Sequence, residues 1–255
     1  MKLVILAGGL GTRFSEETMT KPKPMITILN KPIIWFIMKH YSYYGIKDFI
    51  ICGGYKINYI KKYFQSNSLT HKPVYINKRK VGWNFFYKKE KWNINLINTG
   101  LKTMTGGRIN KIKELLQKEN IFCLTYGDGI SDVNIDQLIK FHKKNKTEAT
   151  ILAVKPPPRF GSLEIRGNKV INFSEKNINL ESYINGGFFV LSNKILKLIN
   201  KSSDIFEHTP LKTLAKNKQL SSFVYKGLWM AMDTLRDKIN IEKYMKNKNK
   251  SKIWA

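Results

Sequence analysis

Glycine, arginine and lysine residues near the start of the chain stand at a spacing that suits phosphate chemistry. The stretch Ala7-Gly8-Gly9-Leu10-Gly11-Thr12-Arg13 follows a short apolar run at 2–6, which predicts a buried strand of a parallel sheet. Glycines allow positive φ and close approach of a ligand, so consecutive N–H groups can converge on phosphate oxygens. Arg13 and Lys23 add positive charge beside this loop. These residues predict a phosphate cradle, and the structural alternative is a tight turn made by the glycines alone.

An aspartate at the end of a later strand could bind a divalent cation. Asp128 stands in the stretch Tyr126-Gly127-Asp128-Gly129, directly after an apolar run at 121–125 that predicts a central strand. Ligands of open α/β sheets bind beyond the carboxyl ends of the strands, and Mg²⁺ prefers oxygen ligands. A helix cap or a simple turn residue is the alternative for Asp128. Helix capping is likewise the structural interpretation of Asp233, which stands at or near the start of the last predicted helix.

Two further polar groups could contact a ligand. Residues 103–108 include two threonines, two glycines and an arginine before a predicted helix, whose N-terminus favours an anion or an acceptor-rich base. Thr105 could at the same time cap that helix. Further along, Glu175 can accept from sugar hydroxyls, Lys176 can meet a sugar phosphate, and Asn185 can both donate and accept. Taken singly, each of these is more often a solvated or turn residue.

The segments that must position these residues alternate between strand-like and helix-like patterns. This alternation is typical of a parallel sheet covered by helices. The predicted strands span 2–6, 47–52, 92–100, 121–125, 149–154 and 220–225, with a short hairpin at 162–173, and the predicted helices span 32–44, 57–64, 109–118, 133–144, 194–199 and 210–216. The predicted fold is α/β, a single Rossmann-like domain over residues 1–255 with a mixed, mostly parallel central sheet flanked by helices.

Two segments do not fit the alternation. Residues 66–92 show no clear period, and their aromatic residues are interleaved with lysines. We interpret this segment as a less regular excursion whose aromatic residues either pack in the core or contact another subunit. A Lys/Asn-rich tail is predicted from about residue 243.

Length, composition and cysteine spacing argue against several classes of protein. With 255 residues the chain can bury a sizeable core, and no apolar run approaches the roughly 20 residues that span a bilayer. The start lacks the form of a signal peptide, so we expect a cytoplasmic protein without membrane contact. Cys52 and Cys123 fall in predicted buried strands, and no His/Cys pair has metal-ligand spacing, which argues against a disulfide framework or a zinc site.

The formal net charge of +27 leaves nucleic-acid binding as a competing hypothesis. Only six of the 45 basic residues are arginines, the type favoured for planar recognition of phosphates and bases, and the lysines are dispersed along the chain. No helix-turn-helix, zinc-finger or aromatic RNA-binding pattern accompanies the charge. We therefore expect no specific nucleic-acid partner.

The glycine loop and the later motifs together resemble the sugar-nucleotide pyrophosphorylases, a family of nucleotidyltransferases. The resemblance extends from Lys2 to about Lys238 and includes the spacing Gly-Gly-x-Gly-Thr-Arg, with Lys-Pro-Lys-Pro-Met ten residues on. Further matching stretches are Phe14-Ser15-Glu16-Glu17-Thr18, Trp92-Asn93, Thr99-Gly100, Met104-Thr105-Gly106-Gly107-Arg108, Arg159-Phe160-Gly161, Ile184-Asn185-Gly186-Gly187-Phe188-Phe189 and Met232-Asp233-Thr234-Leu235-Arg236-Asp237. Thymidylyl- and uridylyltransferases usually have Asn at the position of Gly129, which favours the branch that uses a cytosine nucleotide.

The resemblance implies a homo-oligomeric enzyme that joins CTP and glucose 1-phosphate by in-line attack on the α-phosphorus, with Mg²⁺ as cofactor. It implies catalytic roles for Arg13, Lys23 and Asp128, and it places Mg²⁺ on Asp128 and Asp233. The nucleotide-binding residues that it implies are Leu6, Ala7, Gly8, Gly9, Gly11, Thr12, Arg13, Lys23, Thr103, Arg108, Gly127 and Asp128. The sugar-phosphate-binding residues that it implies are Gly161, Glu175, Lys176 and Asn185.

Three positions depart from the usual motifs of the family. Asn177 follows Lys176 where the family commonly has proline, and Pro158 replaces the glycine of Pro-Pro-Gly-Arg-Phe-Gly. Met230-Ala231 follows Trp229 where the family often has Gln-Pro, which removes an amide near the metal site that the resemblance implies. The alternatives are a nucleotidyltransferase that uses dTTP or UTP, and a basic binding module that keeps the fold without turnover.

Overall fold

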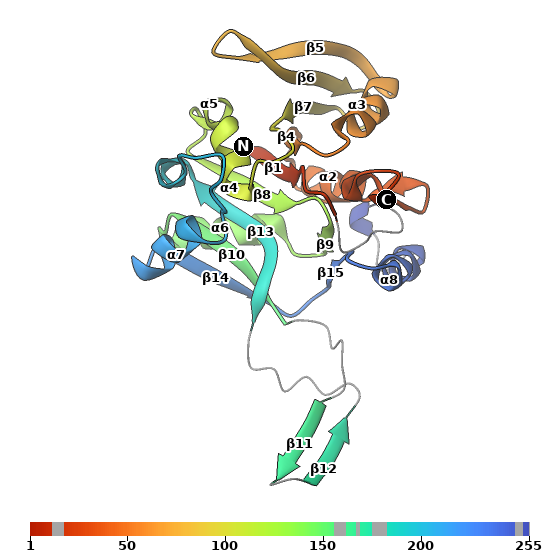
Figure 1. Ribbon diagram of the computed structural model, residues 1–255, viewed down its shortest axis with the longest axis vertical. Helices are drawn as coiled ribbons and strands as arrows, with labels where there is room; N and C mark the ends of the chain where they lie inside the picture. The colour runs from red at the N-terminus through yellow and green to blue at the C-terminus, as the bar shows by residue number, and fades with distance from the viewer. Residues whose placement is uncertain (12–17, 156–161, 167–168, 175–182, 248–251, 255) are drawn as a thin grey trace.

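The computed structural model describes residues 1–11, 18–155, 162–166, 169–174, 183–247 and 252–254. In this part of the chain, a mixed sheet has the strand order β14-β10-β13-β8-β1-β4-β7-β6-β5 (Figure 1). The strands are β1 (Lys2–Ala7), β4 (Asp48–Gly53), β5 (Ser68–Ile76), β6 (Arg79–Tyr87), β7 (Trp92–Asn98), β8 (Ile121–Tyr126), β10 (Ala149–Val154), β13 (Ile184–Ser192) and β14 (Leu220–Tyr225). Strands β6 and β13 run against their neighbours, and the other strands of this described sheet share one direction. The predicted mixed, mostly parallel sheet is confirmed.

Strand β1 lies at the centre of the sheet because its residues are apolar on both faces. Leu3 and Ile5 point to one face and Val4 and Leu6 to the other, and all four are buried. A strand that is buried on both faces carries such a continuous apolar run. Strand β1 pairs in parallel with β4 and β8, so the carboxyl ends of these three strands meet at one edge, where ligands of open α/β sheets bind.

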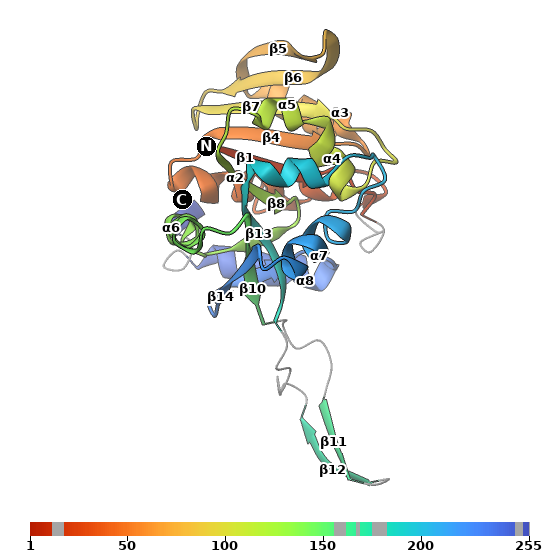
Figure 2. The ribbon, with the colours of Figure 1, turned by 90° about the vertical axis from the view of Figure 1, so that its left-hand side faces the viewer.

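Helices cover both faces of the sheet. On the face of Leu3 and Ile5, the core is closed by α2 (Ile33–Tyr43), α3 (Ile57–Ser66), α6 (Ile135–Asn145) and α8 (Leu235–Lys246). On the opposite face, it is closed by α4 (Thr105–Lys111), α5 (Lys113–Leu116), the 3₁₀ helix η3 (Asn193–Leu198) and α7 (Thr209–Lys216). Figure 1 shows α2, α3 and α8 on one side of the sheet and α4, α5 and α7 on the other, and Figure 2 views the molecule from this second side.

Several short elements complete the description. They are η2 (Lys23–Met25), β2 (Thr27–Ile28), β3 (Lys31–Pro32), β9 (Gly129–Ser131), β11 (Ser162–Arg166), β12 (Lys169–Ser174), β15 (Trp229–Ala231) and η4 (Lys252–Trp254). The predicted hairpin at 162–173 is confirmed as the antiparallel pair β11–β12. The helix predicted over 109–118 begins four residues earlier, at Thr105, and is divided into α4 and α5 at Ile112.

The segment predicted to be irregular, 66–92, contains an antiparallel hairpin with two register shifts. Strands β5 and β6 pair around Asn77 and Lys78, which both have positive φ, as a two-residue hairpin turn requires. Strand β5 is an edge strand with most of its side chains exposed, so its sequence shows no alternation. Of the two interpretations of its aromatic residues, core packing holds for Phe85 and Tyr87, which are buried, while subunit contact stays a prediction.

The C-terminal segment is anchored to the helical layer around α2. Helix α8 extends past the predicted start of the tail, to Lys246. Beyond residues 248–251, which lie outside the described ranges, Trp254 is buried with its ring 6.0 Å from the ring of His40. Figure 1 shows this end of the chain beside α2. A tryptophan on the last turn therefore contributes to the core, which the Lys/Asn-rich composition of the tail did not indicate.

The described residues also bear on membrane contact and on cysteine chemistry. None of their helices has the length and apolar character that a transmembrane span requires. Cys52 and Cys123 are both fully buried free thiols in β4 and β8, as predicted. Burial raises the pKa of each thiol to about 12, so neither is a reactive thiolate at neutral pH.

We expect the stability of the fold to decrease as pH falls below about 6.5, because His40 is buried in its neutral form. Burial lowers the pKa of His40 to about 4, although its hydrogen bond to the Val133 carbonyl, 2.8 Å from Nε2, and the charge of Asp132 oppose the shift. Between pH 4 and 6.5 the unfolded chain therefore binds the extra proton, and the free energy of unfolding falls by up to about 3 kcal/mol. Urea denaturation across this pH range measures the effect.

Two histidine variants separate this contribution from the titration of other groups. His40→Gln is expected to flatten the dependence of the urea midpoint on pH, since it removes the titrating ring. His71→Gln, on the exposed edge strand β5, is expected to keep the dependence of the unchanged protein. An equal dependence in His40→Gln and the unchanged protein would contradict the assignment.

Candidate active site

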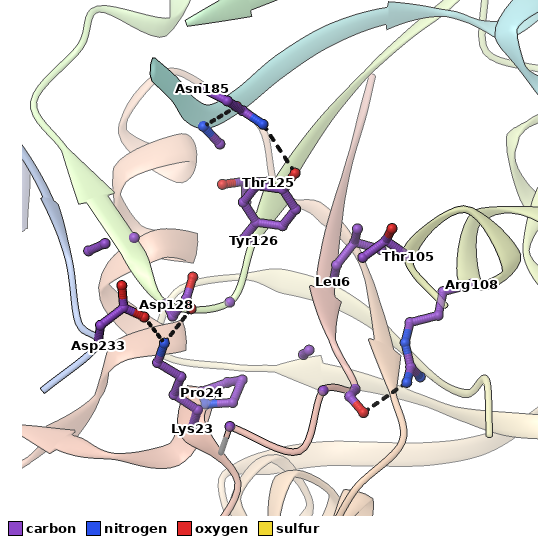
Figure 3. Close-up of a pocket in the computed structure, with 18 of the residues that line it drawn as sticks. Leu6, Lys23, Pro24, Thr105, Arg108, Thr125, Tyr126, Asp128, Asn185 and Asp233 are labelled. Atoms are coloured by element: carbon purple, nitrogen blue, oxygen red, sulfur yellow. Dashed lines mark hydrogen bonds and ion pairs between the residues drawn. The ribbon is translucent and has the colours of Figure 1, made fainter. Parts of the chain in front are cut away.

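A cavity of about 570 Å³ opens at the carboxyl ends of β1 and β8, within the range of typical ligand sites. Every predicted site residue that the structure describes lines this cavity: Leu6, Ala7, Gly8, Gly9, Gly11, Lys23, Thr103, Arg108, Gly127, Asp128, Asn185 and Asp233. Figure 3 shows Lys23 with Asp128 and Asp233 in one part of the pocket, Arg108 in a second and Asn185 in a third. The structure thus brings together residues from opposite ends of the chain.

Five of the predicted site residues lie outside the described residues. They are Thr12, Arg13, Gly161, Glu175 and Lys176. The departures Pro158 and Asn177 also lie outside the described residues. The roles predicted for these residues stay predictions.

The ammonium group of Lys23 lies between the two candidate metal-binding carboxylates. Its Nζ donates to Asp128 Oδ2 at 2.7 Å and to Asp233 Oδ1 at 2.8 Å. Lys23 is the first residue of η2, directly after Pro22, and its side chain is 11% exposed. The helical turn therefore delivers a largely buried cation to the pocket, between the ends of β8 and β15.

The two carboxylates keep Lys23 charged. Burial by itself would lower the pKa of Lys23, but the charge of Asp128 and the hydrogen bonds to both carboxylates outweigh burial, and the net pKa lies above its ordinary value of 10.5. Lys23 is therefore a cation throughout the neutral pH range. A fixed positive charge at this position can stabilise negative charge on phosphate oxygens.

A short two-stranded ribbon sets the distance between Asp128 and Asp233. Strand β9, directly after Asp128, pairs with β15, directly before Met232, and the Met232 N–H donates to the Asp128 carbonyl at 2.9 Å. The departure at Met230-Ala231 falls in this ribbon, where Met230 pairs with Ile130 and Ala231 pairs with Gly129. The ribbon therefore fixes the register of the two carboxylates without the amide that the family often carries.

Helix capping does not explain either aspartate. The N-cap of α8 is Thr234, whose side chain accepts from Asp237 N, and the Asp237 carboxylate accepts in return from the backbone N–H of Thr234. The N-cap of α6 is Asn134, not Asp128. The capping interpretation of Asp128 and Asp233 is wrong, because neighbouring residues fill both caps.

The donor set fits Mg²⁺ bound together with a nucleotide. Within the described residues, no group of three or more His, Cys, Asp and Glu side chains could hold a metal ion by itself. Two carboxylates that already converge on one cation suit Mg²⁺, which usually takes one or two carboxylates and completes its shell with water and substrate phosphates.

Arg108 joins the loops that follow three neighbouring strands. Its guanidinium donates to the carbonyls of Gly8 at 2.8 Å, Gly53 at 3.2 Å and Gly100 at 2.9 Å, and to the Thr99 hydroxyl at 2.6 Å. The residue is 4% exposed, although it also lines the pocket. A contact to the nucleotide stays a prediction for Arg108, and the structure adds that its side chain holds the glycine loop in place.

The polar stretch at 103–108 does not form the predicted anion cradle at its glycines. The Gly107 N–H donates to the Asp204 carbonyl at 3.0 Å, and the Met104 N–H donates to the Ser202 carbonyl at 3.0 Å. A Cβ atom at Gly107 would lie 2.2 Å from Ser202 O, so only glycine permits this contact. The glycines therefore dock the segment 202–204 against α4 and leave the pocket contact to residues such as Thr103.

Two residues that line the pocket and one beside it were not assigned a role from sequence. Tyr126 lines the pocket and donates to Glu207, which follows the docked segment. Trp229 also lines the pocket, and its Nε1 donates to the Gly186 carbonyl at 2.7 Å. Tyr126 directly precedes Gly127-Asp128-Gly129, and Trp229 directly precedes the departure at Met230-Ala231, so their place beside these positions was the available signal. Glu207 had none.

Comparison with known proteins agrees with this arrangement. The chain is 47% identical to glucose-1-phosphate cytidylyltransferase of Salmonella typhimurium and 39% identical to the probable glucose-1-phosphate cytidylyltransferase of Bacillus subtilis, in each case over 100% of both chains. A putative glucose-1-phosphate thymidylyltransferase from Bacillus anthracis, solved with sucrose, superimposes with a TM-score of 0.73 over 97% of this chain and 96% of that one. At 17% identity this last likeness shows the fold alone. A family model described as nucleotidyl transferase matches residues 2–247, and because this match includes both the glycine loop and Asp233, the chain belongs to the nucleotidyl transferase family.

Proposed function

We propose that this protein is a glucose-1-phosphate cytidylyltransferase, which converts CTP and α-D-glucose 1-phosphate into CDP-glucose and pyrophosphate. The observation that carries the proposal is the single pocket in which the glycine loop, Lys23, Asp128 and Asp233 meet. The names of the two relatives at 47% and 39% identity over the full chain support the substrate pair. Gly129, where the thymidylyl and uridylyl branches usually have Asn, supports the choice of cytosine.

The reaction is an in-line displacement that needs no covalent intermediate with the protein. A phosphate oxygen of glucose 1-phosphate forms a bond to the α-phosphorus of CTP, and the bond from that phosphorus to the oxygen of the leaving pyrophosphate breaks. The protein contributes positioning and charge stabilisation. Lys23 uses two of the three donors of its ammonium on Asp128 and Asp233, which leaves the third for a phosphate oxygen.

Asp128 and Asp233 would hold Mg²⁺ in this pocket. When bound there, Mg²⁺ polarises the α-phosphate and offsets its negative charge. The ribbon β9–β15 holds the two carboxylates in register, so both could bind one metal ion beside Lys23. The backbone of Gly8 and Gly9, which Arg108 steadies through the Gly8 carbonyl, would accommodate the nucleotide.

The two substrates would occupy different parts of the pocket. Thr103 and Arg108, with the backbone at Leu6 to Gly9, would hold the base and ribose, and Asn185 would hold glucose 1-phosphate together with Glu175 and Lys176. Figure 3 shows Arg108 and Asn185 well separated around the pocket. The cytoplasmic location and the homo-oligomeric state inferred from the sequence stay predictions.

The test is a pyrophosphate-release assay that crosses CTP, UTP, dTTP, ATP and GTP with a panel of sugar 1-phosphates. We expect release from CTP only when glucose 1-phosphate and Mg²⁺ are both present, and we expect EDTA to abolish it. Equal or greater turnover with dTTP or UTP would overturn the cytidylyl assignment. No release with any pair would overturn the assignment as an active transferase.

A further inference from the structure

One wall of the pocket carries a chain of hydrogen bonds that ends on Glu207. The Gly187 N–H donates to Asn185 Oδ1 at 2.7 Å, and Asn185 Nδ2 donates to the Tyr126 hydroxyl at 3.3 Å. The Tyr126 hydroxyl donates to Glu207, and the Thr105 hydroxyl donates to the other carboxylate oxygen of Glu207 at 2.6 Å. Asn185, Tyr126 and Thr105 line the pocket, whereas Glu207 lies behind them.

The direction of every bond in this chain follows from its two ends. A backbone N–H can only donate, so the Asn185 atom that faces Gly187 is the oxygen and Nδ2 faces Tyr126. The Tyr126 oxygen therefore accepts from Asn185, and its one proton goes to Glu207. At the other end, the Phe206 N–H donates to the Thr105 oxygen at 2.9 Å, so the Thr105 proton also goes to Glu207. Only a carboxylate accepts at both oxygens and donates nothing.

The position of Glu207 is fixed by its neighbours in the chain. The segment 202–204 is docked on α4 through Gly107, as described above. Phe206 is fully buried, with its ring 5.4 Å from that of Phe189, which in turn lies 6.0 Å from the ring of Tyr126. Glu207 is thus held on a packed support and not on a freely moving loop.

We propose that Glu207 is a positioning residue for the sugar phosphate, because it takes the Tyr126 proton and so keeps the Tyr126 oxygen as the acceptor for Nδ2 of the Asn185 amide, whose oxygen the Gly187 N–H holds. This inference rests on the proposed function, in which Asn185 contacts glucose 1-phosphate. With one Nδ2 hydrogen on Tyr126, the second Nδ2 hydrogen is presented to an oxygen of the ligand.

Replacement of Glu207 by glutamine changes the arrangement of hydrogen-bond donors and acceptors in this chain but hardly changes the shape of the side chain. Glutamine offers one accepting oxygen and one donating NH₂ group, so either Tyr126 or Thr105 faces a donor instead of an acceptor. A Tyr126 hydroxyl that reverses places its proton against the Asn185 NH₂ group, which must then rotate. We therefore expect Glu207→Gln to raise the apparent KM for glucose 1-phosphate about tenfold, as for the loss of one well-placed hydrogen bond. The apparent KM for CTP should stay within about twofold.

Steady-state kinetics with each substrate varied at saturation of the other tests the inference. Tyr126→Phe keeps the ring and removes only the hydroxyl, so it should raise the apparent KM for glucose 1-phosphate as selectively as Glu207→Gln does. If Glu207→Gln does not fold, Tyr126→Phe takes its place as the test of the hydrogen-bond chain. The double variant should be no worse than the more impaired single variant, because both changes break one chain. Glu242→Gln, the same charge change on α8, is the matched control and should behave as the unchanged protein.

The outcomes separate the inference from the proposed function. Failure of the unchanged protein to turn over CTP with glucose 1-phosphate would overturn the proposed function. If the unchanged protein is active, equal rises in both KM values, additive effects in the double variant, or no change in KM for glucose 1-phosphate would overturn the role of Glu207. A selective and non-additive rise would support it.

Discussion

Asp233→Asn is expected to lower kcat by about a hundredfold or more, with a melting temperature close to that of the unchanged protein. The substitution exchanges an anionic oxygen for a neutral one of the same shape. A metal-dependent phosphoryl centre then loses about 3 kcal/mol of transition-state stabilisation. The cap of α8 should not be affected, because Thr234 and Asp237 form it without the Asp233 side chain. Pyrophosphate-release kinetics beside thermal denaturation measures both quantities.

Three further variants sharpen this result. Asp128→Asn should resemble Asp233→Asn, and the double variant should fall far short of the product of the two effects, as residues that act as a unit do. Asp136→Asn, an exposed aspartate in the first turn of α6, is the charge-matched control and should keep full activity. A near-normal kcat in a folded Asp233→Asn protein would remove Asp233 from the site.

Lys23→Met is expected to lower kcat/KM by about a thousandfold, or about 4 kcal/mol of transition-state stabilisation. Methionine keeps the apolar part of this largely buried side chain and removes only its charge. The loss falls on the phosphate groups, whose developing negative charge no longer meets a preorganised cation. Lys140→Met, at an exposed position on α6, makes the same chemical change away from the pocket and should leave kcat/KM unaltered.

The same variant reports on metal binding without relying on activity. In the structure, the Lys23 ammonium lies within 2.8 Å of one oxygen of each carboxylate, where it competes with any other cation. Without that ammonium, Asp128 and Asp233 should bind Mg²⁺ more readily in the absence of nucleotide. Mg²⁺ is therefore expected to raise the melting temperature of Lys23→Met more than that of the unchanged protein. An equal response in both proteins would argue that the two carboxylates do not share a metal ion.

The fold was predictable where elements are long and buried. Strands β1, β4, β8 and β10 are continuous apolar runs, and their predicted bounds differ from the observed ones by at most one residue. The hairpin β5–β6 was missed because an edge strand with both faces exposed has no hydrophobic period to detect. The burial of Trp254 beside His40 was not predictable, because the residues around it are mainly lysine and asparagine and only one aromatic side chain makes the contact.

Some residues of the candidate site were predictable from the sequence, and others became apparent only in the structure. The sequence alone indicated the glycine loop and Asp128, because each follows a recognisable strand. It also indicated Lys23, which stands in the motif Lys-Pro-Lys-Pro-Met. It did not indicate that Asp233 would meet Lys23, because the ribbon β9–β15 that brings them together has only three residues in each strand. Glu207 was equally out of reach, as were the bonds of Arg108 to the Gly8 and Gly53 carbonyls, because these partners lie far away in the chain.

What the sequence determined by itself is local chemistry: which stretches are buried strands, where backbone can approach a phosphate, and which charged groups stand at strand ends. These properties depend on neighbours within a few residues, so a single sequence contains them. Only the tertiary structure decided which groups form a hydrogen bond or an ion pair or line the same pocket. Such contacts form across 105 residues between Lys23 and Asp128 and 81 between Tyr126 and Glu207. They arise because η2 and the segment before α7 both reach the carboxyl end of β8, and no local pattern records that meeting.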